Sequence, residues 1–278
     1  MNCYFYTFGC KVNTCETAGM QSLLQSAGYT VVSQPEEADI FLFNSCTVTA
    51  SGDSRLRHAM RKVRREHPDA LLVLTGCYPQ AYPDEAAAIP EADLVLGTKH
   101  RSRLPGLLAE LCQNHARIAA VDSYGAQDDF EALPCDTMPD NTRAFLKIQD
   151  GCNCFCSYCI IPYARGPVRS LPLEEAVRQT EQLRREGYRE VVFTGIEISS
   201  WGQDLKDGRS LIDLLEAVSQ VVSNVSLLRP TSQNIDLAFT ETGWQKGKAM
   251  AIAKGLFEQG ILFERSVGNG LKEYTVAN

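Results

Sequence analysis

The 278-residue sequence has no long hydrophobic run and no excess of positive charge, and each absence excludes a class of protein. No apolar stretch approaches the ~20 residues that a membrane-spanning helix needs, so we expect no membrane partner. The start, Met1-Asn2-Cys3-Tyr4, lacks the basic and apolar segments of a signal peptide, which predicts a cytoplasmic protein. The net charge of −7 is unlike that of a dedicated nucleic-acid binder.

Cysteine, by contrast, is abundant, with 11 residues. An odd number of thiols in a reducing compartment argues against a disulfide framework. Cys152, Cys156 and Cys159 have the spacing C-x3-C-x2-C, and Cys154 lies between them. Thiolates are soft ligands that suit iron–sulfur clusters or zinc. A zinc site needs a fourth protein ligand, for which Cys154 is a candidate. So short a loop is hard to wrap around a tetrahedral ion, which favours a cluster with one open iron.

A second set of cysteines follows three predicted strands. The segments 3–8, 39–43 and 70–74 are β-prone, and Cys10, Cys46 and Cys77 stand just beyond them. Helical patterns over about 20–28 and 53–66 separate these strands, and a short fourth strand is predicted at 94–96. The pattern predicts a parallel sheet, in which the carboxyl ends of the strands share one edge. We therefore expect the three thiols to converge; the alternative is three buried structural thiols.

The second half of the chain predicts another α/β unit. Residues 122–142 are polar and rich in Asp, Pro and Gly, which is typical of a linker. Strands are predicted at 144–148, 190–194 and 225–228, with helices beginning near Pro172 and Ser210. This βαβαβ order is the start of a barrel. The predicted fold class is α/β, an N-terminal parallel-sheet domain followed by an incomplete (βα) barrel.

The cysteine motifs resemble a known family. Residues 151–166 read Gly-Cys-Asn-Cys-Phe-Cys-Ser-Tyr-Cys-Ile-Ile-Pro-Tyr-Ala-Arg-Gly. This string resembles the radical S-adenosylmethionine (SAM) superfamily, and within it the methylthiotransferases. The resemblance implies two 4Fe–4S clusters, one held by Cys152, Cys156 and Cys159 and the other by Cys10, Cys46 and Cys77.

The same resemblance implies S-adenosylmethionine as a cofactor, bound at the open iron of the first cluster. Tyr158, Thr194 and Gly195 fall where the superfamily contacts this cofactor, although Thr194 and Gly195 also fit a strand that ends at a glycine turn. The thiols of Cys3, Cys15, Cys112 and Cys135 match no ligand position, and Cys154 occupies a spacer position.

Two strings resemble the tRNA threonylcarbamoyladenosine methylthiotransferases in particular. They are residues 7–17, Thr-Phe-Gly-Cys-Lys-Val-Asn-x-x-Glu-Thr, and residues 160–166. The implied reaction replaces the C2 hydrogen of the modified adenosine at tRNA position 37 with a methylthio group; the sister isopentenyladenosine enzyme is the alternative. Implied partners are the tRNA anticodon arm, an electron donor and a sulfur donor. Because acid–base chemistry does not activate an aromatic C–H bond, no proton-shuttling catalytic residue is predicted.

The basic segment within residues 53–66 either faces the anticodon arm or is a solvated helix face. It contains Arg55, Arg57, Arg61, Lys62, Arg64 and Arg65.

The predicted domains are 1–121 (iron–sulfur domain), 122–142 (linker), 143–228 (partial radical SAM core) and 229–278 (unassigned tail). The resemblance stops after Leu228, where the family continues with more barrel strands and an RNA-binding module. The tail instead predicts a helix over 248–260 and a hairpin of strands 261–266 and 271–276. The alternative function is therefore a truncated, catalytically impaired iron–sulfur protein, whose sheet edge is exposed unless the tail covers it.

Overall fold

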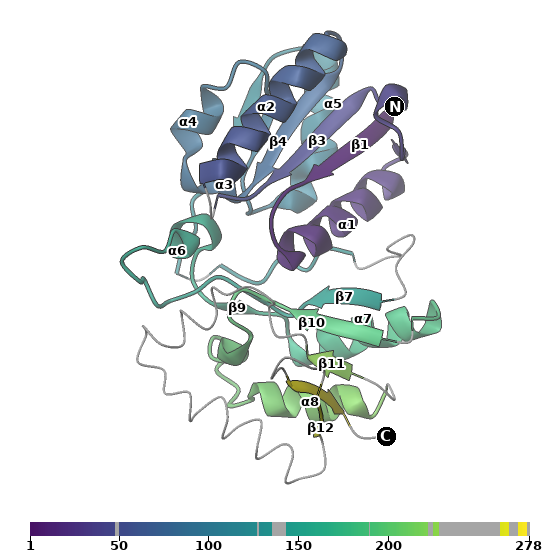
Figure 1. The fold of residues 1–278 in the computed structure, drawn as a ribbon, viewed down its shortest axis with the longest axis vertical. Coiled ribbons are helices and arrows are strands. Elements are labelled where there is room, and N and C mark those ends of the chain that lie inside the picture. The colour runs from purple at the N-terminus through teal and green to yellow at the C-terminus, as the bar shows by residue number, and fades with distance from the viewer. Residues whose placement is uncertain are drawn as a thin grey trace. The chain divides into compact units, whose positions relative to one another are not determined.

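The computed structural model describes residues 1–47, 50–126, 128–134, 143–188, 190–221, 225–227, 262–266 and 272–276. The chain forms two compact units (Figure 1). The first consists of Met1–Asp136 and Gly151–Pro167, and the second of Thr137–Asp150 and Val168–Asn278. The cysteine-rich loop thus belongs by its contacts to the first unit, although the strands that flank it belong to the second.

The first unit is built on one parallel sheet. Its strands are β1 (Asn2–Thr7), β2 (Thr30–Val31), β3 (Ile40–Ser45), β4 (Leu71–Gly76), β5 (Leu94–Leu96) and β6 (Ile118–Ala120). Their order is β2-β1-β3-β4-β5-β6, and every neighbouring pair is parallel. The predicted parallel sheet is confirmed, with β2 and β6 as additional strands that the sequence patterns did not indicate.

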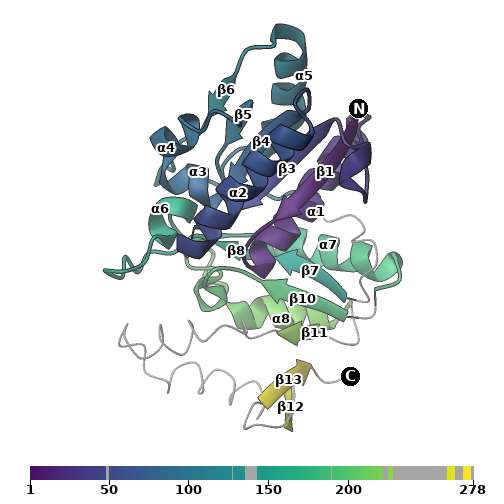
Figure 2. The ribbon, with the colours of Figure 1, turned by 45° about the horizontal axis from the view of Figure 1, so that its top comes forward.

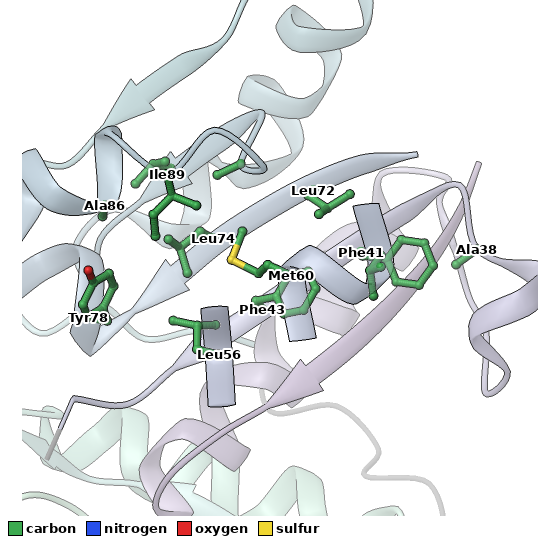
Figure 3. Close-up of a cluster of buried hydrophobic side chains, with 13 residues drawn as sticks. Ala38, Phe41, Phe43, Leu56, Met60, Leu72, Leu74, Tyr78, Ala86 and Ile89 are labelled. Carbon is green, nitrogen blue, oxygen red and sulfur yellow. The ribbon is translucent and has the colours of Figure 1, made fainter. Parts of the chain in front are cut away.

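Helices cover both faces of this sheet. The helices of this unit are α1 (Lys11–Ser26), α2 (Ala50–Glu66), α3 (Cys77–Ala81), α4 (Pro83–Ala87), α5 (Leu104–Asn114) and α6 (Ile161–Arg165), with 3-10 turns at Pro35–Glu37 and Arg101–Arg103; α6 packs against α3. Phe41 and Phe43 pack in the cluster that contains Met60 of α2 (Figure 3). Ile40 and Leu42 pack in the other cluster, with the helices α1 and α5. Alternate residues of β3 thus serve two cores, as a doubly covered parallel sheet requires.

The second unit carries a mixed sheet. Its elements are β7 (Arg143–Lys147), β8 (Gln149–Asp150), β9 (Arg169–Ser170), α7 (Leu173–Arg185), β10 (Glu190–Thr194), a 3-10 turn at Ile198–Ser200, α8 (Leu211–Ser219), β11 (Val225–Leu227), β12 (Leu262–Ser266) and β13 (Lys272–Val276). The main sheet has the order β12-β13-β11-β10-β7, and β8 pairs with β9. Strands β7, β10 and β11 are parallel, as the start of a barrel predicts.

The predicted C-terminal hairpin is confirmed: β12 and β13 are antiparallel (Figure 2). Strand β13 also pairs with β11, where Ser226 lies opposite Thr275. Strand β13 therefore lies along the edge of β11, and β12 becomes the outer strand of the sheet. The helix predicted over 248–260 lies outside the described residues, as does part of the predicted linker. Within the described chain, no helix is long and apolar enough to cross a membrane.

Candidate iron–sulfur sites

The cysteines that follow strands lie at one end of the first unit's sheet. Cys10 directly precedes α1, Cys46 directly follows β3, and Cys77 is the first residue of α3. Gly9 has a φ of 109°, and a Cβ at this position would lie 2.5 Å from the Cβ of Cys46. The turn that carries Cys10 therefore touches the turn that carries Cys46. This close approach needs a residue without a side chain at position 9.

Cys77 is the most buried of these three thiols. Burial raises the pKa of the Cys77 thiol to about 11, and the Arg165 guanidinium opposes this rise. The negative charges of Glu16, Cys46 and Cys10 raise the Cys77 pKa further. Cys77 thus follows β4 at the same end of the sheet as Cys10 and Cys46, and their convergence on one cluster stays a prediction.

A buried amide network joins the start of α1 to the end of β3. The Asn13 side-chain Nδ2 donates to the Ser45 carbonyl at 2.9 Å and to Asn44 Oδ1 at 3.2 Å. Asn44 Nδ2 donates back to the Asn13 carbonyl at 2.9 Å, and the Cys10 thiol donates to Asn13 Oδ1 at 3.2 Å. Both amides are fully buried. They fix the turns from which Cys10 and Cys46 project.

The C-x3-C-x2-C loop is closed at its base by the main chain. The Cys152 N–H donates to the Gly166 carbonyl at 3.0 Å, and the Cys159 N–H donates to the Cys156 carbonyl at 2.9 Å. Gly151 has a φ of 74°, and a Cβ there would lie only 1.9 Å from the Pro167 carbonyl oxygen. The loop is therefore a tight structure. Cys152, Cys156 and Cys159 are half-buried in it, whereas Cys154 is exposed.

Of the residues predicted to contact the cofactor, Tyr158 lies in this loop of the first unit, and 64% of its surface is exposed. Thr194 and Gly195 lie in the second unit, where β10 ends. The Thr194 carbonyl accepts a hydrogen bond from the Ile148 N–H at 2.9 Å, and a Cβ at Gly195 would lie 2.9 Å from the Gln149 carbonyl oxygen. The absence of a side chain at Gly195 thus lets two main-chain segments approach closely.

The donor sets fit iron–sulfur clusters. None of the six predicted ligands forms a disulfide with a described residue. Three follow strands at one end of the sheet, and three lie in one short loop. A set of three thiolates leaves one iron of a cubane open. Soft thiolate ligands are the ones that iron–sulfur clusters use.

Sequence reasoning assigned no role to Glu16 or Arg165, although both belong to the strings that carry the resemblance. Arg165 is fully buried, and its guanidinium forms ion-pair contact with Glu16 and donates to the Cys77 sulfur. The only local signal was the position of Arg165, a charged residue a few positions after the cysteine motif. Its partners lie about 90 and 150 positions earlier in the chain, which no local pattern reveals.

Comparisons with known proteins agree with this architecture. Residues 2–97 match the uncharacterized protein family UPF0004, and residues 146–237 match the radical SAM superfamily. A solved structure of the radical S-adenosylmethionine methyltransferase TsrM from Kitasatospora setae has a TM-score of 0.53 at 12% identity, over 79% of this chain and 52% of that one. The chain therefore has the α/β fold of the radical SAM class.

Curated relatives are more specific. The threonylcarbamoyladenosine tRNA methylthiotransferase MtaB of Bacillus subtilis is 40% identical over 82% of this chain and 50% of its own length. The enzyme of the same name from Aquifex aeolicus is 37% identical, over 84% and 57%. The tRNA-2-methylthio-N(6)-dimethylallyladenosine synthase of Desulforamulus reducens is 33% identical, over 77% and 48%.

The chain belongs to the radical SAM methylthiotransferase family, and it spans about half the length of the curated relatives that it matches. Membership supports an iron–sulfur cluster and S-adenosylmethionine as cofactors.

Proposed function

We propose that this protein is a transferase that converts N6-threonylcarbamoyladenosine at tRNA position 37 into its 2-methylthio derivative. The observation that carries the proposal is the presence, in one unit, of three strand-end thiols together with a C-x3-C-x2-C loop. The names of the Bacillus and Aquifex relatives support the threonylcarbamoyl substrate. Because the Desulforamulus relative is named for dimethylallyladenosine, the reaction on that nucleoside is the alternative to be tested.

We assign two 4Fe–4S clusters to the chain. Cys152, Cys156 and Cys159 are the proposed ligands of one, and Cys10, Cys46 and Cys77 those of the other. S-adenosylmethionine bound with the cluster of the loop cysteines would supply the radical chemistry for the adenosine C2–H bond. S-adenosylmethionine would also supply the methyl group for the inserted sulfur. The chain's own contribution is to fix the ligands: the Asn13–Asn44 network orients the turns of the strand-end set, and the closed loop base orients the other.

The proposed cofactor contacts are Tyr158, Thr194 and Gly195. Tyr158 presents an exposed ring on the cysteine loop, and an aromatic face is suited to pack against a purine. At Gly195 the contact would be made by the main chain, because this residue has no side chain.

We retain the division into 1–121, 122–142, 143–228 and 229–278 as the proposed domains of the chain. The loop 151–167 is covalently part of the third and packs with the first. This arrangement supports a radical SAM core whose cysteine loop is held by the iron–sulfur domain.

The proposed partners are tRNA, through its anticodon arm, an electron donor and a sulfur donor, in the cytoplasm. The basic helix α2 is less available for RNA than its composition suggests. Arg57, Arg61 and Lys62 pair with Glu85, Glu91 and Glu66 at 3.3, 3.5 and 3.9 Å. The most exposed of these cations are Arg61 and Lys62, at 69% and 57% of their side-chain surface, and they are the ones we propose for phosphate contact.

Nucleoside analysis tests the function. The chain would be expressed in a bacterial strain that lacks both of its own tRNA methylthiotransferases, and digested tRNA would be analysed by mass spectrometry. We expect the 2-methylthio derivative of threonylcarbamoyladenosine, and its loss in the Cys156→Ala variant but not in Cys112→Ala, the matched control. Detection of the methylthiolated isopentenyl nucleoside instead would assign the sister reaction. The absence of both methylthiolated nucleosides would contradict the proposal.

A further inference from the structure

Arg165 connects the two cysteine sets. It ends helix α6, six positions after Cys159, and none of its surface is exposed. Its Nε donates to the Sγ of Cys77 at 3.2 Å, and its Nη1 donates to Glu16 Oε1. Its Nη2 lies 3.4 Å from Asn13 Oδ1, the same oxygen that accepts from the Cys10 thiol. One guanidinium from the cysteine loop thus contacts the surroundings of two strand-end thiols.

The main chain around Arg165 is also fixed to the first unit. The Thr98 hydroxyl donates to the Ala164 carbonyl at 2.8 Å. Gly166 packs so closely on Tyr124 that a Cβ at position 166 would lie 2.4 Å from the ring carbon Cγ. Helix α6 lies beside α3, the helix that Cys77 begins (Figure 1). Arg165 is therefore held in place on both sides of its Cα.

A second buried arginine lies at this position. Glu16 also pairs with Arg101, whose Nη1 lies 2.8 Å from Glu16 Oε1, and both side chains are 1% exposed. Two buried guanidinium groups thus contact the same carboxylate oxygen, and one of them, Arg165, also donates to the Cys77 sulfur. Within the described residues, Nε and Nη2 of Arg101 have no hydrogen-bond partner. Negative charge on the Cys77 sulfur is stabilised by the charged hydrogen bond from Arg165.

We propose that Arg165 is a positioning residue that raises the reduction potential of the cluster held by Cys10, Cys46 and Cys77. This inference rests on the second cluster of the proposed function. Three thiolates give a cubane a net negative charge, and reduction by one electron from an external low-potential reductant makes that charge more negative without breaking a bond. A hydrogen bond to a ligand sulfur and a buried positive charge both stabilise the reduced form. Glu16 has the opposite effect because it offsets the arginine charge.

The test measures a potential rather than activity. The parent protein is the full chain with Cys152, Cys156 and Cys159 changed to Ala, so that only the strand-end set remains. After anaerobic reconstitution, its cluster is titrated with dithionite and redox mediators, and the reduced form is followed by electron paramagnetic resonance. If this parent holds no iron, the proposed second cluster is wrong, and that outcome is distinct from failure of the inference.

In this parent, Arg165→Met removes the hydrogen bond and the charge, and we expect the midpoint potential to shift to more negative values. Arg165→Lys keeps the charge and should shift less. Glu16→Gln removes a negative charge and should shift the potential to more positive values. If Arg165 and Glu16 had a purely structural role, both substitutions would change the cluster in the same direction. Opposite shifts of the midpoint potential identify an electrostatic role.

Arg61→Met is the matched control, because it removes an exposed arginine from the same unit and should leave the potential unchanged. If Arg165→Met does not fold or does not hold iron, Arg165→Lys and Glu16→Gln decide the matter. An unchanged midpoint potential in Arg165→Met would overturn the inference. Shifts of the same sign in Arg165→Met and Glu16→Gln would overturn it as well.

Discussion

Gly9 and Cys46 approach so closely that a Cβ at Gly9 would lie 2.5 Å from the Cβ and 3.0 Å from the Sγ of Cys46. Real Cβ atoms do not come this near to a neighbour, so any side chain at position 9 must displace the turn that carries Cys46. The positive φ of Gly9 adds strain for every other residue type, about 1–3 kcal/mol. The geometry of the strand-end thiols thus depends on this glycine.

Gly9→Ala should therefore lose iron from the strand-end site while the loop site keeps its own. We expect about half of the iron to be lost after reconstitution, together with a fall in the free energy of unfolding. Iron analysis and thermal unfolding measure the two effects. Gly28→Ala is the control, because Gly28 also has a positive φ, 89°, but in the described part of the chain a Cβ there meets no atom within 4 Å. A Gly9→Ala protein with full iron content would show that the close approach is unimportant.

Arg64 belongs to the fold rather than to an RNA-binding face. Its guanidinium donates to the carbonyls of Pro68, Ala70 and Glu91 at 2.9, 2.8 and 3.0 Å, and it pairs with Asp93 at 2.6 Å. Arg64→Ala removes these four interactions, although Asp93 Oδ2 keeps the hydrogen bond from the Leu72 N–H, and this should lower the free energy of unfolding by about 1–3 kcal/mol. Chemical denaturation of the apoprotein measures this loss.

Arg61 is the comparison for Arg64 on the same helix. Its ion pair with Glu91 is long, 3.5 Å, and the Arg61 side chain is 69% exposed. Arg61→Ala should change stability by less than about 1 kcal/mol, because exposed ion pairs contribute little. If the proposed phosphate contact exists, the same variant reduces the salt dependence of tRNA binding by roughly one unit of slope. Equal stability losses for Arg61→Ala and Arg64→Ala would contradict this distinction.

Helix α8 begins with a capping box that gives the second unit a pH-dependent contribution. The Ser210 hydroxyl and N–H lie 2.7 and 2.6 Å from Asp213 Oδ2, and these hydrogen bonds lower the pKa of the Asp213 carboxyl. A lowered folded-state pKa stabilises the protein above the ordinary carboxyl pKa, about 3.9, and this contribution is lost as the pH falls through the folded value.

Ser210→Ala should cost about 1 kcal/mol at neutral pH, within the usual range for a lost N-terminal cap. The difference between the variant and the parent should shrink as the medium becomes acidic, because protonated Asp213 no longer benefits from the cap. Urea unfolding at pH 7 and at successively lower pH measures the trend. A difference that grows on acidification would show that the carboxylate does not contribute to the cap.

Strong local patterns were sufficient to predict most of the fold. The strand–turn–cysteine segments gave β1, β3 and β4, and Ser210 with its apolar stripe gave α8. The patterns missed β2 and β6, since two or three residues at a sheet edge carry no periodic signal. The helices α3 and α4 were also not predicted, because each has only five residues and α3 begins directly at the end of β4.

The thiols of the candidate site could be proposed from the sequence, whereas its polar surroundings could not. Cysteine spacing is a local property, and topology alone brings strand ends together, so Cys10, Cys46 and Cys77 could be singled out as candidate ligands. The contacts of Arg165 with Glu16 and Cys77 join residues separated by 149 and 88 positions. Such contacts depend on how the loop packs within the first unit. No short segment of the sequence carries a pattern that predicts this packing. The same is true of Arg64, whose structural role was hidden among neighbouring basic residues.

The measurement that tests the account most directly is the iron and sulfide content of the anaerobically reconstituted chain and two triple variants. We predict about eight irons per chain, and about four in each variant, Cys10/Cys46/Cys77→Ala and Cys152/Cys156/Cys159→Ala. The two variants should also differ in their response to S-adenosylmethionine, which should change the paramagnetic spectrum only where the loop cysteines remain. About four irons in the parent, or loss of all iron in either variant, would contradict two independent cysteine sets.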